Sequence, residues 1–134
     1  MTHTVLIIED NQDLSELLGI YLSGFGYEIS RAENSSQGIS KALAERPDVI
    51  ITDLHLPDMN GVEATAVLKN NPVTSKIPII VLTAMSVGEW KKKALKAGVA
   101  EYLVKPISPP DLVETVRKLT ETVRDQTPSL LTEL

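Results

Sequence analysis

Five short apolar runs divide the sequence, and they differ in how hydrophobic and polar positions alternate. Three of them, residues 4–9, 49–53 and 79–82, are almost continuous Val, Ile and Leu. Continuous apolarity predicts strands that are buried on both faces, which is typical of the interior of a parallel sheet. The runs at 27–31 and 101–104 alternate more, so we expect them at the sheet edges.

Segments with apolar residues at helical spacing separate these runs. The positions that mark the five helices are Leu14, Leu17, Leu18, Tyr21 and Leu22; Ile39, Ala42 and Leu43; Val62, Ala66 and Val67; Trp90, Ala94, Leu95 and Ala97; and Leu112, Val113, Val116, Leu119 and Val123. Ser35 or Ser36 is the expected cap of the second helix. Five βα units predict an α/β, doubly wound domain of three layers, because right-handed crossovers place helices on both faces of the sheet.

Length, charge and composition set limits on this domain. The 134 residues fit one domain, for which we expect residues 1–124, followed by a tail or linker at 125–134. The net charge of -5 argues against direct contact with nucleic acid. The first residues lack the pattern of a signal peptide, and no apolar run approaches a membrane span, so we expect a cytoplasmic protein.

Chemically active side chains follow four of the predicted strands. Glu9 and Asp10, then Asp53, Thr83 and Lys105, each lie at or just past a strand's carboxyl end. Ligands of doubly wound sheets bind at this edge, where the strand order reverses. We therefore expect these five residues to form one site.

Three carboxylates at one place require a counter-charge. Two unit charges about 4 Å apart repel by roughly 4 kcal/mol at an effective dielectric of 20. Mg²⁺, or Mn²⁺ in its place, suits such a set because it prefers oxygen ligands. Cysteine is absent and only His3 and His55 offer imidazole, which disfavours zinc or copper.

A cation beside Asp53 makes this carboxylate a candidate phosphoryl acceptor. Aspartate can attack phosphorus to give an acyl phosphate. Catalysis of such a transfer is mostly positioning and charge stabilisation. The Lys105 ammonium and the Thr83 hydroxyl could stabilise the phosphoryl oxygens.

The chain resembles a receiver domain of the response regulators of two-component signalling, with the fold of the chemotaxis receivers. The motifs that carry the resemblance are ED at 9–10, DLHLPDMNG at 53–61, PIIVLTA at 78–84 and KALKAGVAEYLVKP at 93–106. Together they extend over roughly residues 4–123. The resemblance implies a flavodoxin-like (βα)5 domain with the strand order 2-1-3-4-5.

The resemblance also implies roles for single residues. Asp53 would be the phosphorylated residue. Asp10 would bind Mg²⁺ directly, Glu9 through water, and the backbone carbonyl of His55 would be a further ligand. Lys105 would pair with the phosphoryl group.

Further implied roles concern the switch and the rate of hydrolysis. Thr83 and Tyr102 would be the switch pair, in which the hydroxyl moves toward the phosphoryl group and the ring turns inward. The bond between Lys105 and Pro106 would be cis. His55 and Met85 occupy positions where side chains tune phosphoryl hydrolysis.

The implied partners are those of a phosphorylation-activated signalling domain. A histidine kinase or a histidine phosphotransfer protein would donate the phosphoryl group. The face made by the fourth helix, fifth strand and fifth helix would then bind a downstream effector or a C-terminal output domain. The domain would act as a monomer or weak homodimer, and would catalyse only its own phosphotransfer and slow dephosphorylation.

Three alternatives stand beside this interpretation. A phosphohydrolase of the haloacid-dehalogenase type would need a second acid two residues after Asp53, where this chain has His55. A flavodoxin would need a phosphate loop after the first strand, where this chain is acidic. A receiver-like interaction module that is not phosphorylated could dispense with the five site side chains, all of which are present.

Overall fold

The computed structural model describes residues 2–85 and 88–125, with side chains as far as 121. In these residues strands and helices alternate strictly. The elements are β1 (Thr4–Ile8), α1 (Gln12–Ser23), β2 (Glu28–Ala32), α2 (Ser35–Glu45), β3 (Val49–Thr52), α3 (Gly61–Lys69), β4 (Ile79–Thr83), α4 (Gly88–Ala97), β5 (Glu101–Val104) and α5 (Pro109–Asp125). The predicted succession of five βα units is confirmed.

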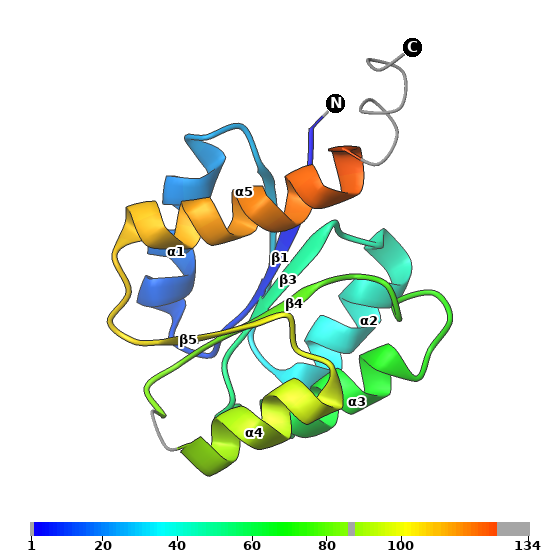
Figure 1. Ribbon diagram of the computed structural model, residues 1–134. Coiled ribbons are helices and arrows are strands. Elements are labelled where there is room, and N and C mark those ends of the chain that lie inside the picture. Colours follow the sequence, from blue (N-terminus) through cyan, green and yellow to red (C-terminus); the bar gives the residue numbers. More distant parts are fainter. Residues whose placement is uncertain (1, 86–87, 126–134) are drawn as a thin grey trace.

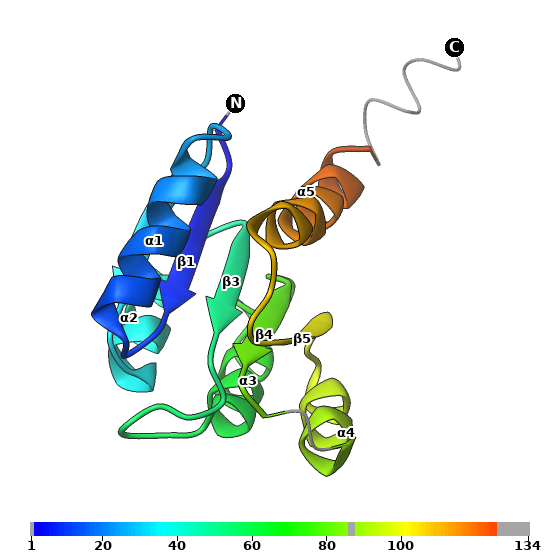
Figure 2. The same ribbon diagram turned by 90° about the vertical axis from the view of Figure 1, so that its left-hand side faces the viewer.

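The five strands form one parallel sheet in the order β2-β1-β3-β4-β5. Helices α1 and α5 cover one face, and α2, α3 and α4 cover the other (Figure 1). In Figure 2, turned by 90°, β4 and β5 lie between α5 on one side and α3 and α4 on the other. The doubly wound α/β fold is therefore confirmed, and so is the placement of the two alternating strands at the edges.

The central strands are buried on both faces because each contributes to two cores. Val5 and Ile7 pack with residues of α1 and α5, whereas Leu6 and Ile8 pack with residues of α2, α3 and α4. All four side chains are at most 1% exposed. Successive residues of a strand point to opposite faces, so the continuous apolar pattern follows from two covered faces.

Three residues assigned to apolar helix stripes are in fact exposed. Leu17, Val67 and Leu95 are 61%, 44% and 46% exposed. In α3 the buried face includes Thr65, whose hydroxyl donates a hydrogen bond to the Gly61 carbonyl at 2.7 Å. A threonine that bonds to its own helix can be buried, and a pattern of apolar residues misses such a position.

The predicted cap of the second helix is wrong by one residue. Asn34, rather than Ser35 or Ser36, caps α2, because its backbone is extended and its side-chain oxygen accepts the Gln37 amide at 2.8 Å. Ser35 is the first helical residue, and its hydroxyl donates to the Met59 carbonyl at 2.7 Å. Its side chain therefore joins two elements instead of capping its own helix.

The remaining expectations concern the ends of the chain. Residues 126–134, most of the expected tail, and the side chain of Val123 lie outside the described residues. Among the helices that the structure describes, none combines the length and the apolarity needed to cross a bilayer.

Candidate metal and phosphoryl site

The strand order brings the predicted site residues to one edge of the sheet. β1, β3, β4 and β5 lie side by side, and all of them end at this edge. An open pocket of about 450 Å³ lies there. It is lined by Glu9, Asp10, Asn11, Asp53, His55, Thr83, Ala84 and Lys105.

Lys105 joins two carboxylates from different strands. Its Nζ lies 2.8 Å from Glu9 Oε1 and 2.8 Å from Asp53 Oδ2. Glu9 is only 4% exposed and Asp53 is 9% exposed, so water screens these charges little. The lysine therefore holds two largely buried acids at the bottom of the pocket.

Burial and charge shift the proton affinities of this group in a consistent way. Burial of Glu9 disfavours its charged form and raises the pKa of its carboxyl, in spite of the hydrogen bond to Lys105. Burial works against the charge of Lys105 too, but the hydrogen bonds and charges of Asp53 and Glu9 outweigh it and raise the pKa of the ammonium group. Lys105 is therefore protonated at neutral pH, and the site has an excess of negative charge.

Three acids are placed to hold a cation. Glu9, Asp10 and Asp53 each offer a carboxylate oxygen, and these atoms lie within 4.8 Å of one another. Lys105 compensates one of their three charges, which leaves an excess of two negative charges in an open pocket. An all-oxygen donor set with this charge fits a hard divalent cation such as Mg²⁺.

The backbone of the β3–α3 loop contributes to the same group. The His55 amide donates to Asp53 Oδ1 at 3.1 Å, whereas Lys105 contacts Oδ2, so both oxygens of the carboxylate are held. The His55 side chain is exposed, and its ring and that of Trp90 of α4 are in a T-shaped arrangement, with their centroids 6.2 Å apart. The role of its carbonyl as a ligand stays a prediction.

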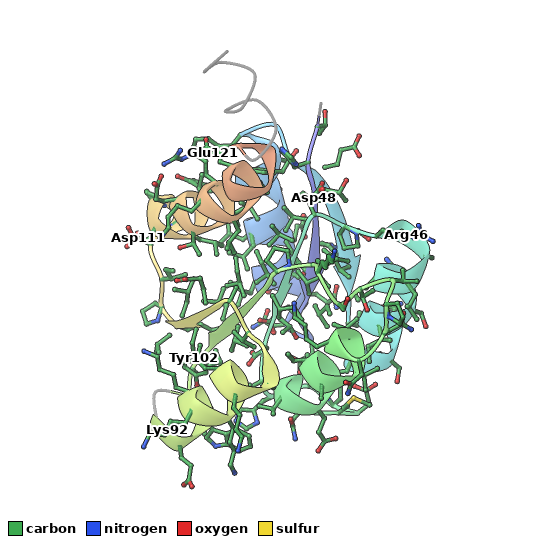
Figure 3. All side chains as sticks on the ribbon, turned by 45° about the vertical axis from the view of Figure 1, so that its right-hand side comes forward. Arg46, Asp48, Lys92, Tyr102, Asp111 and Glu121 are labelled. Atoms are coloured by element: carbon green, nitrogen blue, oxygen red, sulfur yellow. The ribbon has the colours of Figure 1, made fainter. Side chains whose placement is uncertain are left out.

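Thr83 and Tyr102 meet at a third residue, Met85. The buried Thr83 hydroxyl accepts the Met85 amide at 3.3 Å, and the Tyr102 hydroxyl donates to the Met85 carbonyl at 2.5 Å. Figure 3 shows Tyr102 on β5, beside α4. Burial raises the pKa of the Tyr102 hydroxyl, and the charge of Asp53 adds to this shift. One loop therefore connects the site with the α4 side of the sheet.

The remaining observations near the site concern Pro106, Asp58 and Trp90. The peptide bond between Lys105 and Pro106 is cis. The hydrogen bonds of Asp58 to α2 were not predicted from the sequence, because their partners lie in a different element. The contact of Trp90 with His55 was also missed, because an aromatic residue at helical spacing gives no sign of a partner on another loop.

Comparison with known proteins decides the family. A sequence model of the response regulator receiver domain matches residues 5–117. The chain belongs to this family. Receiver domains are phosphorylation-activated signalling domains that interact with kinases and output effectors, and this receiver has the acidic cluster in place.

Similar proteins include regulators of different lengths. The phosphate regulon transcriptional regulatory protein PhoB of Pseudomonas aeruginosa is 36% identical over 114 residues, which are 85% of this receiver and 50% of PhoB. The polar-differentiation response regulator DivK of Brucella anthropi is 33% identical over 117 residues, which are 87% of this receiver and 95% of DivK. The chain thus spans half the length of one curated relative and nearly all of the other.

Solved structures agree with this assignment. A putative response regulator from Chloroflexus aurantiacus superposes with a TM-score of 0.85 at 32% identity, covering 90% of this receiver and 99% of that chain. The chemotaxis response regulator CheY4 of Vibrio cholerae gives 0.84 at 28% identity, with coverage of 89% and 99%. The receiver fold therefore extends over the described sheet and its helices.

Proposed function

We propose that this receiver accepts a phosphoryl group on Asp53 from a phosphohistidine of a histidine kinase or of a histidine phosphotransfer protein. The observation that carries the proposal is the placement of the Asp53 carboxylate in the open pocket, between Lys105 and the acidic cluster. A carboxylate oxygen of Asp53 forms the bond to phosphorus, while the bond from phosphorus to the donor imidazole breaks and the imidazole keeps the electron pair.

The residues around Asp53 have complementary tasks in this proposal. Glu9, Asp10 and Asp53, with the His55 carbonyl, hold Mg²⁺. When bound, the cation neutralises charge on the transferring phosphoryl oxygens. Lys105 stabilises a second oxygen, and the Thr83 hydroxyl a third once it leaves the Met85 amide.

The response follows from the loop that Thr83 shares with Tyr102. Phosphorylation adds a charge of about -1.5 to -2 and three strong hydrogen-bond acceptors. If Thr83 turns to the phosphoryl group, the Met85 amide loses its hydrogen bond to the Thr83 hydroxyl. The Met85 carbonyl is the acceptor of the Tyr102 hydroxyl, so the change reaches Tyr102. The face formed by α4, β5 and α5 is then in equilibrium between two conformations. Phosphorylation shifts this equilibrium by the free energy with which it stabilises one conformation over the other.

The output belongs to the same proposal. DivK-like and PhoB-like relatives differ in length, so the partner of the switched face is either a separate effector protein or an output domain on the same polypeptide. We further propose a cytoplasmic location and a monomer or weak homodimer. His55 lines the pocket, and the Met85 backbone bonds to Thr83, which supports a role of these two residues in setting the lifetime of the phosphoryl group.

A labelling experiment tests the acceptor. Incubation with acetyl phosphate and Mg²⁺ should add one phosphoryl group, seen by intact-mass spectrometry and removed by hydroxylamine. Asp53→Asn should abolish the label, whereas Asp13→Asn, a nearby acid in the first turn of α1, should retain it. Equal labelling of wild type and Asp53→Asn would reject the acceptor assignment.

A further inference from the structure

The loop that follows Asp53 is fastened to the start of α2 by three hydrogen bonds. The Ser35 and Ser36 amides donate to the two oxygens of Asp58, at 2.9 and 2.8 Å. The Ser35 hydroxyl, on a fully buried residue, donates to the Met59 carbonyl at 2.7 Å. The exposed carboxylate of Asp58 thus satisfies two free amides of a helix in a different part of the chain.

The other end of the loop is closed directly beside Asp53. The Gly61 amide donates to the Leu54 carbonyl at 2.9 Å. A Cβ atom at Gly61 would lie 2.6 Å from the Asp53 carbonyl oxygen, so only glycine allows this approach. The loop is therefore closed at its base by the bond between Gly61 and Leu54 and held at its tip by Asp58. His55 lies between Leu54 and Asp58 in the sequence.

Helix α2 is a suitable support because it also packs against the strand that carries the other two acids. A Cβ atom at Gly38 would lie 2.4 Å from Ile8 Cδ1, so the helix lies tightly on the end of β1. Ile8 immediately precedes Glu9 and Asp10. The same helix thus contacts both segments that carry the acidic cluster, β1 through Ile8 and the loop after Asp53 through Asp58.

We propose that Asp58 is a positioning residue for the cation site: by tying the loop to α2, it fixes the His55 backbone relative to Glu9, Asp10 and Asp53 and so sets the affinity for Mg²⁺. This inference rests on the proposed function. The hydrogen bonds from Ser36 and Ser35 lower the pKa of Asp58 to about 2, so the carboxylate is charged at neutral pH. Mutation of residues that orient metal ligands without contacting the cation typically lowers the affinity for the metal by about 10–100-fold.

The test compares two residues that cap the same helix. Asp58→Ala removes the tie between α2 and the loop, whereas Asn34→Ala removes a cap of α2 whose side-chain oxygen accepts the Gln37 amide of its own helix. Isothermal titration calorimetry with MgCl₂, well below the unfolding temperature of each variant, gives the dissociation constants. We expect Asp58→Ala to weaken Mg²⁺ binding about tenfold and Asn34→Ala to leave it within a factor of two.

Two further variants keep the test decisive if Asp58→Ala folds poorly. Asp58→Asn retains one acceptor and should give an intermediate affinity, and Ser35→Ala should weaken binding through loss of the bond to Met59. The fluorescence of Trp90, the single tryptophan of the chain, which contacts His55, gives a second readout of Mg²⁺ addition.

Unchanged affinity in Asp58→Ala, or an equal loss in Asn34→Ala, would overturn this inference alone. A wild-type protein that fails to bind Mg²⁺ would overturn the proposed function and this inference with it. The two failures are therefore distinguishable in one set of titrations.

Discussion

Asp10 offers the sharpest test of the acidic cluster. Lys105 forms ion pairs with Glu9 and Asp53, whereas Asp10 is exposed and has no ion pair among the described residues. In the metal-free protein Asp10 therefore adds repulsion to a pair of carboxylates that share the single positive charge of Lys105. We expect Asp10→Asn to stabilise the metal-free protein.

The structure gives the size of this effect. Charges at the 4.8 Å limit of the cluster repel by ~0.9 kcal/mol in water and ~3.5 kcal/mol at an effective dielectric of 20. Asp10 is repelled by Glu9 and by Asp53 and attracted by Lys105. The attraction offsets one of the two repulsions, so the net effect is about one repulsion between two unit charges. Since Asp10 is exposed, its value lies near the aqueous limit, about 1 kcal/mol. For a domain of this size the corresponding rise in Tm is about 4 °C.

The assay is thermal unfolding in EDTA and in Mg²⁺. In EDTA, Asp10→Asn should melt above the wild type. Mg²⁺ at ten times its Kd should stabilise the wild type by about 1.4 kcal/mol and Asp10→Asn by much less, so their order reverses. Glu16→Gln, an exposed acid of α1 outside the cluster, controls for the change in net charge. A Tm of Asp10→Asn at or below the wild type in EDTA, or an equal response to Mg²⁺, would refute the reasoning.

Two other predictions follow from ion pairs and hydrogen bonds at and beside the site. Lys105→Met leaves Glu9 and Asp53 without their counter-charge and should lower the free energy of unfolding in EDTA by about 3 kcal/mol, as measured with urea. Adding Glu9→Gln should recover part of this loss. Stability of Lys105→Met at or above the wild-type value would contradict the pairing. Hydrogen bonds from Ser36 and Ser35 lower the pKa of Asp58 from 3.8 to about 2, so its contribution to stability is complete above pH 4 and is lost as the pH falls through 2. Urea midpoints between pH 2 and 5 should therefore fall less steeply in Asp58→Asn than in the wild type, and parallel curves would exclude this contribution.

The sequence by itself determined the order of the layers and the edge that carries the chemistry. Continuous apolar runs identify β1, β3 and β4 as interior strands, because a strand covered on both faces buries the side chains of both faces and favours apolar residues at successive positions. Acids, a hydroxyl and an ammonium at the ends of four parallel strands must then meet at one edge. These inferences need only the local period of the chain and the rule that parallel strands point the same way.

Tertiary structure alone decided which of these groups touch. Lys105 bridges Glu9 and Asp53 across 96 and 52 residues of sequence, and Asp58 reaches α2 across 22 and 23. Such partners depend on the paths of loops and on a few tenths of an ångström, which no local pattern encodes. For the same reason the sequence pattern did not predict three further features: the burial of Thr65, the cap at Asn34, and the meeting of Thr83 and Tyr102 at Met85. Each depends on hydrogen bonds whose geometry only the folded chain fixes.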